Sequence, residues 1–371
     1  MRIALVAHSN APWTHHYAQS FVAGGHHVCV VSYHPVAVAG VRTIFMGGAG
    51  REPIPKHRYL TSVPALRTAL RGYAPDVVLA TYLTSNGLAA ALAWRGPLVV
   101  SARGGDVLEQ AGGTRLPAWL KARLLRFVCR RAAVVHVVSD EIAEALLALG
   151  VLPSRIVGFP VGVDVEHFRP IESTRPSSES LRIICTRAHD AVYHNDVVVE
   201  AFARLRSAGR DVRLDFVGDG PLLEARRRQV DRLGLSSLVT FVPRVPNEGM
   251  PELLRAADIY VSASSSDGTS ASLLEGLATG LPPVVSRIRA NEPWVHDGEN
   301  GFLFNVGDSE DLSRVMTLAC DRDDVRERAR TENPALVRAH ANMTTNNARM
   351  IDLLASVARA ALRRGRYQQG S

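Results

Sequence analysis

Short, continuous apolar runs alternate with amphipathic stretches along most of the chain, beginning with Ile3 to Ala7. Apolar runs of this length without alternation predict parallel strands that are buried on both faces. Similar runs lie at residues 27–32, 77–81, 98–101, 133–138, 181–186, 213–217, 239–242 and 258–262. Apolar residues at helical spacing lie between several of these runs, as at 88–94, 139–149, 197–208 and 222–233. The pattern predicts an α/β fold built from doubly wound parallel sheets.

This strand and helix rhythm stops near residue 165 and restarts at 181, after a segment rich in Ser, Glu and Pro. A chain of 371 residues is also long for a single core. We therefore expect two doubly wound domains facing a ligand-binding cleft. The predicted division is a first domain at 1–165, a linker at 166–180, a second domain at 181–340, and a terminal helix and tail at 341–371.

The composition is that of a soluble globular protein, with 46% hydrophobic and 21% charged residues. The four cysteines form no C-x-x-C pair, and no apolar run reaches the length of a membrane span, so we expect a cytoplasmic protein. A net charge of +7 favours acidic partners such as nucleic acid, an anionic membrane surface or phosphorylated ligands. An aromatic content of only 6% argues against nucleic acid.

The most informative stretch follows the strand at 258–262. A polar loop of small residues leads into an apolar helix, whose first turn would offer unpaired backbone N–H groups to a phosphate. The small residues are Gly268, Thr269, Ser270, Ala271 and Ser272. Asp267 and Glu275 flank this turn and could accept hydrogen bonds from sugar or ribose hydroxyls. The alternative is that Ser, Thr and Asp simply cap the helix.

Candidate ligand contacts also follow strands of the first domain. His8 lies at the carboxyl end of the first strand, where open α/β sheets bind ligands, and His15 lies shortly after it. The nearby histidines show no metal-ligand spacing, and the G-x-G-x-x-G dinucleotide motif is missing. Arg103 and Asp106 flank a Gly pair after another strand, and they could contact a ligand or only shape a tight turn.

Two motifs together resemble a known family. The segment from Asp267 to Glu275 is followed by Gly280, Pro282 and a Val pair, and residues 160–170 read PVGVDVEHFRP. Both resemble the glycosyltransferase family GT4, whose members have the GT-B fold and retain the anomeric configuration. The resemblance implies two Rossmann-like domains, with a C-terminal helix that crosses back to the first. It also implies metal-independent transfer of a sugar from a nucleoside diphosphate sugar, with UDP-sugar as the expected donor and no cofactor.

The resemblance also assigns roles. Arg187 and Asp267, together with Asp106, are the expected catalytic residues. The donor-binding set is the turn from Gly268 to Ser272 with Glu275, Arg244, Val245 and Gly218. His8, His15 and Arg103 are expected on the acceptor side.

Three positions depart from the family pattern: Asp267 replaces Glu, Ser270 replaces Gly, and a Lys expected shortly after Arg187 is missing. The candidates to replace this Lys are Tyr193, His194, Arg287 and Arg289.

Other functions stay open at this point. A nucleotide-sugar-binding protein without activity is one alternative, and a GT-B epimerase is another. The acceptor could be a soluble metabolite or an envelope glycan. The predicted helix at 116–131 carries Arg123, Arg126 and Arg130 on one face, opposite Leu120, Leu124, Phe127 and Val128. That basic face would be solvated, or it would contact an anionic membrane weakly.

Overall fold

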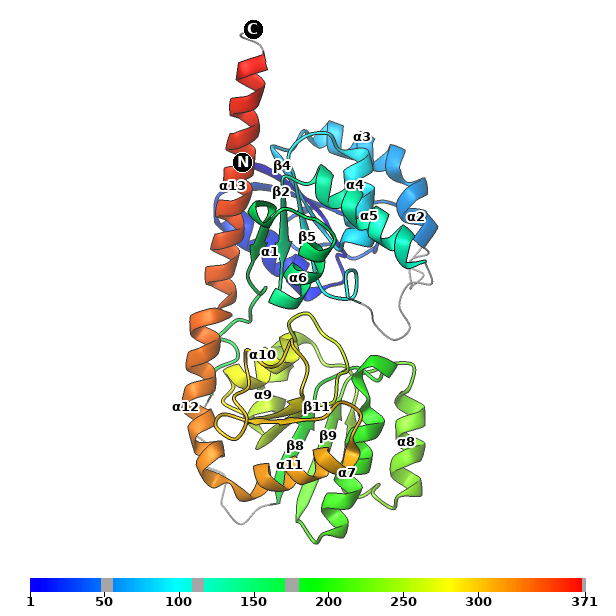
Figure 1. Cartoon of the computed structure of the whole chain (residues 1–371), viewed down its shortest axis with the longest axis vertical. Coiled ribbons are helices and arrows are strands. Elements are labelled where there is room, and N and C mark those ends of the chain that lie inside the picture. Colours follow the sequence, from blue (N-terminus) through cyan, green and yellow to red (C-terminus); the bar gives the residue numbers. More distant parts are fainter. Residues whose placement is uncertain (48–55, 109–116, 171–179, 369–371) are drawn as a thin grey trace. The chain divides into compact units, whose positions relative to one another are not determined.

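The computed structural model describes residues 1–47, 56–108, 117–170 and 180–368, which form two compact units (Figure 1). The first unit contains the described residues up to Val161 together with the segment from Thr344 onward. The second runs from Gly162 to Met343. The chain thus returns to its first unit at the end, as the resemblance implied.

The first unit contains a parallel sheet of seven strands in the order β3-β2-β1-β4-β5-β6-β7. The strands are β1 (Arg2–Val6), β2 (His27–Ser32), β3 (Arg42–Phe45), β4 (Val77–Thr81), β5 (Leu98–Ala102), β6 (Val134–Val137) and β7 (Ile156–Gly158). The strands β1, β4 and β5 are buried almost throughout, which explains their continuous apolar sequence.

Helices cover both faces of this sheet (Figure 1). They are α1 (Pro12–Ala23), α2 (Lys56–Thr61), α3 (Val63–Tyr73), α4 (Leu88–Ala93), α5 (Ala118–Arg131), α6 (Asp140–Ala148) and α13 (Met343–Gln368). Apolar residues of α3, α4, α5 and α6 share one core cluster. On the other face, Tyr17 and Phe21 of α1 pack in one cluster with Met350 and Leu354 of α13. A π-helical turn, Leu83–Gly87, and a 3-10 turn, Pro153–Arg155, complete the unit.

The second unit repeats this architecture with six parallel strands in the order β10-β9-β8-β11-β12-β13. They are β8 (Leu181–Cys185), β9 (Val212–Val217), β10 (Val239–Val242), β11 (Ile259–Ser262), β12 (Pro283–Ser286) and β13 (Phe302–Phe304). The helices are α7 (Asn195–Ser207), α8 (Leu223–Arg232), α9 (Met250–Arg255), α10 (Ala271–Ala278), α11 (Ser309–Asp321) and α12 (Asp323–His340), with 3-10 turns at Ala191–Tyr193 and Asn247–Gly249. Residues of α7, α8 and α11 share one core cluster, and residues of α9, α10 and α12 share another.

The boundary between the units lies after Val161, whereas the sequence placed the end of the first domain at 165. Val163 and Phe168 are buried in the second unit's core. Gly162 has a positive φ of 88°, and a Cβ atom there would lie 2.5 Å from the carbonyl oxygen of Ala341. Residues 166–170 therefore belong to the second domain rather than to the predicted linker. The remainder of that linker, 171–179, lies outside the described residues.

The segment named for membrane contact differs in one detail from the expectation. Leu125, Val128 and Cys129 form the buried face of α5, while Phe127, predicted to be buried, is 38% exposed. No helix in the described part of the chain combines the length and the apolar character needed to cross a bilayer.

Candidate donor and acceptor sites

Three of the candidate residues follow strands at the point in each sheet where the strand order reverses. In the second unit this point lies between β8 and β11, and Arg187 follows β8 while Asp267 follows β11. In the first unit it lies between β1 and β4, and His8 follows β1. Ligands of open α/β sheets bind outside the carboxyl ends of the strands at such switch points.

Arg187 is the centre of the site in the second unit. It is buried, and its Nη1 donates to the hydroxyls of Ser270 and Ser272 at 2.7 and 2.8 Å. Its Nη2 donates to Asp267 Oδ2 at 2.7 Å in an ion pair. Burial alone would lower the pKa of Arg187, but the Asp267 carboxylate raises it above its ordinary value. Arg187 therefore stays charged and joins the ends of two neighbouring strands.

Helix α10 begins immediately beside this arginine. Ser270 is its N-cap, and the Ser270 hydroxyl accepts a hydrogen bond from the backbone N–H of Leu273. The backbone N–H of Gly268 donates to Asp267 Oδ1 at 2.9 Å. The backbone N–H groups of Ala271 and Ser272 have no intrahelical acceptor, because they belong to the first turn. Ser270 therefore caps the helix, as one of the two interpretations predicted, and the cap leaves the first-turn N–H groups of Ala271 and Ser272 unpaired within the helix.

Glu275 lies one turn further along α10. Its carboxyl group is largely desolvated, and burial raises the pKa of Glu275 to about 7, although the charge of Arg187 acts in the opposite direction. Glu275 can therefore change its charge near neutral pH. As a carboxylate it can accept hydrogen bonds from hydroxyl groups of a ligand.

Three of the four candidates to replace the missing Lys can be placed relative to Arg187 or to its neighbouring elements. The guanidinium lies over the Tyr193 ring, 4.0 Å from its centroid, so Tyr193 contributes a cation–π contact. His194 adopts a left-handed backbone conformation before α7. Arg287 is exposed and pairs with Asp297 at 2.6 Å. Arg187 is therefore the cation placed directly beside Ser270 and Ser272.

Neighbouring loops supply the other predicted donor contacts. Gly218 follows β9 with a positive φ of 140°, and its backbone packs against Ala188 next to Arg187. Arg244 is exposed and Val245 half-buried in the loop after β10. His189, not considered from the sequence, is buried against Phe216 in the same region. Burial, with the charges of two nearby arginines, lowers the pKa of His189 to about 4, so the ring is neutral at pH 7.

In the first unit, aromatic rings surround His8 at the end of β1. His8 stacks on Tyr82 with 5.1 Å between centroids and makes an edge contact with His34 at 4.8 Å. Its Nε2 lies 3.1 Å from the Tyr59 hydroxyl. Tyr82 has a positive φ of 63°, which is rare outside glycine and is typical of functional sites. His15 instead turns back along its own loop, where its Nε2 lies 2.6 Å from the carbonyl oxygen of Ser9.

Asp106 is buried and shapes the loop after β5. Its Oδ2 accepts from the backbone N–H of Leu83, and its Oδ1 accepts from those of Arg103 and Gly104. These contacts fit the tight-turn alternative of the sequence analysis. They give Asp106 a positioning role, whereas the resemblance had placed it among the catalytic residues.

Arg103, held by this loop, lies against α1. Its guanidinium carbon is 5.6 Å from the ring centroids of both Trp13 and Tyr17. Trp13, Tyr17 and Tyr82 are not among the site residues predicted from the sequence. A signal was available, because aromatic residues are scarce in this chain and Trp13 and Tyr17 lie one helical turn apart after β1.

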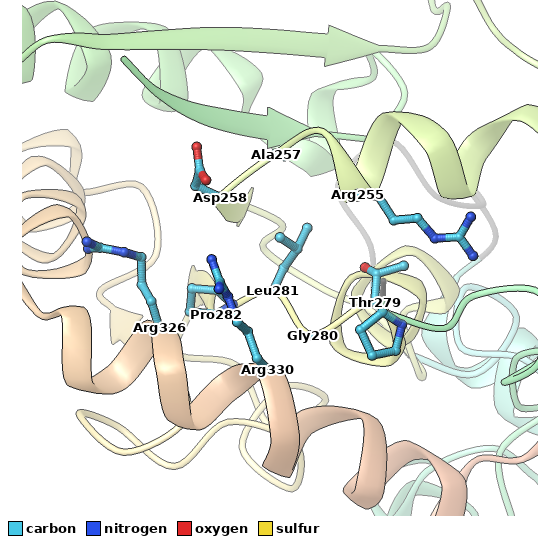
Figure 2. A pocket seen from close by; sticks show the side chains of 10 residues that line it. Arg255, Ala257, Asp258, Thr279, Gly280, Leu281, Pro282, Arg326 and Arg330 are labelled. Carbon is cyan, nitrogen blue, oxygen red and sulfur yellow. The ribbon is translucent and has the colours of Figure 1, made fainter. Parts of the chain in front are cut away.

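A surface pocket of the second unit lies away from these residues (Figure 2). It is lined by residues that precede β11 and β12, such as Asp258 and Pro282, and by Arg326 and Arg330 of α12. It therefore opens at the amino ends of the strands, opposite the candidate site. Arg326 donates to the carbonyl oxygens of Ala319 and Cys320 at the end of α11, so it has a structural role.

Two family models match the chain. The model for glycosyl transferases group 1 matches residues 171–335, and the model for a glycosyl transferase 4-like domain matches residues 11–162. The chain is a GT4-type glycosyltransferase. The group 1 model covers Arg187, Asp267 and Glu275, and the glycosyl transferase 4-like model covers Arg103.

Individual members of this glycosyltransferase family are distant. A putative glycosyltransferase EpsD of Bacillus subtilis is 27% identical over 163 residues, which is 42% of each chain. Sucrose-phosphate synthase from Thermosynechococcus elongatus superposes with a TM-score of 0.83 at 18% identity, covering 97% of this chain and all of that one. Anabaena HepE in complex with UDP superposes with a TM-score of 0.77 at 18% identity, covering 96% and 100%. These likenesses show the GT-B fold of the glycosyltransferase.

Proposed function

We propose that this protein is a retaining glycosyltransferase that moves a hexose-type sugar from a nucleoside diphosphate sugar to a hydroxyl acceptor. The observation that carries the proposal is the junction of Arg187 with the first turn of α10. There a fixed positive charge and unpaired backbone N–H groups meet at one strand end, next to two carboxylates. A diphosphate linked to sugars is complementary to all of these groups, because its phosphates are negatively charged and its sugars carry hydroxyl groups.

Stabilising the departing diphosphate is the main catalytic requirement, because negative charge develops on it in the transition state. Arg187 and the amides of Ala271 and Ser272 supply preorganised donors for that charge. Asp267 pairs with Arg187 and neutralises its charge. Donor binding therefore replaces part of this ion pair, and Asp267 turns to hydroxyl groups of the transferred sugar. We propose that transfer requires no metal ion, since these donors provide the positive potential.

UDP is the nucleotide we propose first, supported by the similarity to HepE, whose structure contains UDP. Glu275 would accept hydrogen bonds from the ribose hydroxyls, and Arg244 and Val245 would flank the base. Gly218, with no side chain, lets the phosphates approach the loop after β9. His8, His15 and Arg103 belong to the acceptor side in this proposal.

The test is a thermal-shift series with UDP, GDP, ADP and TDP, followed by hydrolysis or transfer assays with the matching nucleotide sugars. A ligand that binds only the folded protein must raise its melting temperature. We expect one nucleotide to stabilise the protein and its sugar conjugate to be turned over. Stabilisation without any turnover would indicate a nucleotide-sugar-binding protein, and no stabilisation by any nucleotide would refute the assigned site.

We also propose that α5 contacts anionic membranes. Trp119, Arg123, Arg126 and Arg130 follow each other at helical spacing, and Trp119 is 65% exposed. Phe127, also exposed, lies beside this stripe. An aromatic residue among arginines is suited to the interface of an anionic bilayer. An acceptor linked to a lipid would then be reached at the membrane surface.

A further inference from the structure

The first unit contains a group of hydrogen-bond donors for which its described residues provide no acceptor. Arg103 Nε and Nη2, Trp13 Nε1 and the Tyr17 hydroxyl are all buried without a hydrogen-bond partner. Arg103 forms no ion pair within the described part of the chain. Its guanidinium lies beside the rings of Trp13 and Tyr17, and it also acts on the Tyr17 hydroxyl, where burial raises the pKa of the phenol and Arg103 opposes that rise. A buried donor without an acceptor destabilises the folded protein, and such groups are rare in native structures.

These donors lie together because of the strand register. Ser101 on β5 pairs with Thr81 on β4, so their side chains lie on the same face of the sheet, and Arg103 follows two residues after Ser101. That face is covered by α1, which brings in Trp13 and Tyr17. The Thr81 hydroxyl is likewise buried without a partner. All of them lie near the carboxyl ends of the strands, on the ligand-binding edge.

Two members of this set, the Arg103 guanidinium and the Trp13 indole, can only donate hydrogen bonds. The Tyr17 phenol and the Thr81 hydroxyl can both donate and accept. A carboxylate is close in sequence, but both oxygens of Asp106 accept backbone N–H groups. The complementary ligand group is therefore one that accepts several hydrogen bonds and carries negative charge, namely an oxyanion.

We propose that Arg103, Trp13 and Tyr17 form a subsite for an oxyanion, a phosphate or carboxylate, on the sugar or polyol that accepts the transferred glycosyl group. That the bound molecule is the acceptor rests on the proposed function. That it carries an oxyanion rests on the residues of the first unit alone. Arg103 is only partly buried, so one edge of the guanidinium is within reach of a ligand. The Asp106 loop holds Arg103 in place, which explains why a buried carboxylate lies there without touching the arginine side chain.

The experiment is a calorimetric titration of the full chain, saturated with UDP, with glucose 6-phosphate, glucuronate, glucose and inorganic phosphate. We expect at least one charged sugar to bind on the order of tenfold or more tightly than glucose, because charge-assisted hydrogen bonds are the strong ones. A preference for glucose 6-phosphate would identify a phosphate, and a preference for glucuronate a carboxylate. Inorganic phosphate is expected to bind more weakly than the preferred sugar.

Variants locate the subsite. Arg103→Gln should remove the preference for the charged sugar, whereas Arg103→Lys should keep part of it. Trp13→Phe and Tyr17→Phe remove one donor each with little change of shape, and each should weaken the charged sugar severalfold without affecting glucose. Arg95→Gln, an exposed arginine of the same unit, is the matched control.

Several results would overturn the inference while UDP still binds. They are equal affinity for glucose and both charged sugars, no binding of either charged sugar, or inorganic phosphate binding as tightly as the sugar. A loss of UDP affinity in Arg103→Gln would also overturn the inference, since Arg103 would then bind the nucleotide-sugar donor. If UDP fails to bind the wild-type protein, the proposed function fails instead, and the two failures are thus distinguishable.

Discussion

At the scale of single residues, the buried carboxylate of Glu275 lowers the stability of the folded protein at neutral pH, and its proposed role in binding the donor explains why it is there. The carboxyl group has an ordinary pKa of 4.5 and a pKa of about 7 in the folded protein. The folded state thus binds a proton that the unfolded state has released between these two pH values. The contribution of Glu275 to the free energy of unfolding is therefore most favourable below pH 4.5. It decreases as the pH rises from 4.5 to about 7 and stays constant at higher pH. A buried acid with such a penalty is typical of a functional site.

We therefore predict that Glu275→Gln stabilises the protein at pH 8 by a few kcal/mol at most, following the size of the pKa shift. The gain should shrink toward zero as the pH falls to 4.5, and the same variant should bind the donor more weakly. Urea unfolding followed at several pH values measures this. A destabilised variant at pH 8 would show that the carboxylate is needed by the fold rather than by a ligand.

The ion pair between Arg187 and Asp267 shows where reasoning from sequence stops at this scale. Both residues were named as catalytic from the family motif, but their pairing depends on β8 and β11 being neighbours in the sheet. Strand order is a property of the tertiary fold. The sequence shows that Ser270 replaces the Gly usual in the family. The structure adds that the Ser270 hydroxyl accepts a hydrogen bond from Arg187 and so helps to hold it. The contact of Arg103 with Trp13 and Tyr17 depends on the tertiary fold for the same reason, although the spacing of these two aromatic residues is visible in the sequence.

At the scale of elements, continuous apolar runs predicted the central strands well because both faces of those strands are buried. The short edge strands β3, β7 and β13 were missed. β3 and β7 are exposed or half-buried along their length, so their sequences lack an apolar run. The three residues of β13 are fully buried but too few to form a recognisable pattern. The exposed Phe127 on α5 shows a second limit, because helical spacing alone does not define which face is buried.

That exposed face of α5 leads to a prediction about membranes. The full chain should sediment with vesicles that contain phosphatidylglycerol and not with pure phosphatidylcholine vesicles, and salt should weaken the binding. Trp119→Ala and the pair Arg123→Gln with Arg130→Gln should each reduce it severalfold. Arg71→Gln on α3 is an exposed control that should change nothing. Binding that is equal for both vesicle types, or unchanged in the variants, would contradict the role given to α5.

At the scale of the whole molecule, two sheets of parallel strands and a returning terminal helix were expected and are present. The first domain was predicted to end at 165 because the Ser-, Glu- and Pro-rich segment that follows indicated a linker at 166–180. The apolar residues Val163, Val165 and Phe168 are nevertheless buried in the second core. Composition cannot reveal such packing, since it depends on a partner segment near Ala341.

The terminal helix α13 gives a prediction that separates the two units. Leu354 is fully buried against the first sheet, whereas Leu362 on the same helix is 65% exposed. Leu354→Ala should cost about 2–5 kcal/mol. Calorimetry should show a lower melting temperature for the first unit, while UDP still stabilises the second. Leu362→Ala should leave both unchanged, and a loss of UDP binding in Leu354→Ala would show that the donor site depends on this helix.

The central claim is that the strand ends around Arg187 and α10 hold a nucleoside diphosphate sugar, and calorimetric titration of the stabilising nucleotide and its sugar conjugate tests it directly. Glu275→Ala should lower the affinity at least tenfold, since the ribose would lose a charged hydrogen-bond partner. Glu252→Ala, an exposed glutamate on α9 of the same unit, should bind like the wild type. Unchanged affinity in a folded Glu275→Ala protein would contradict the assigned site.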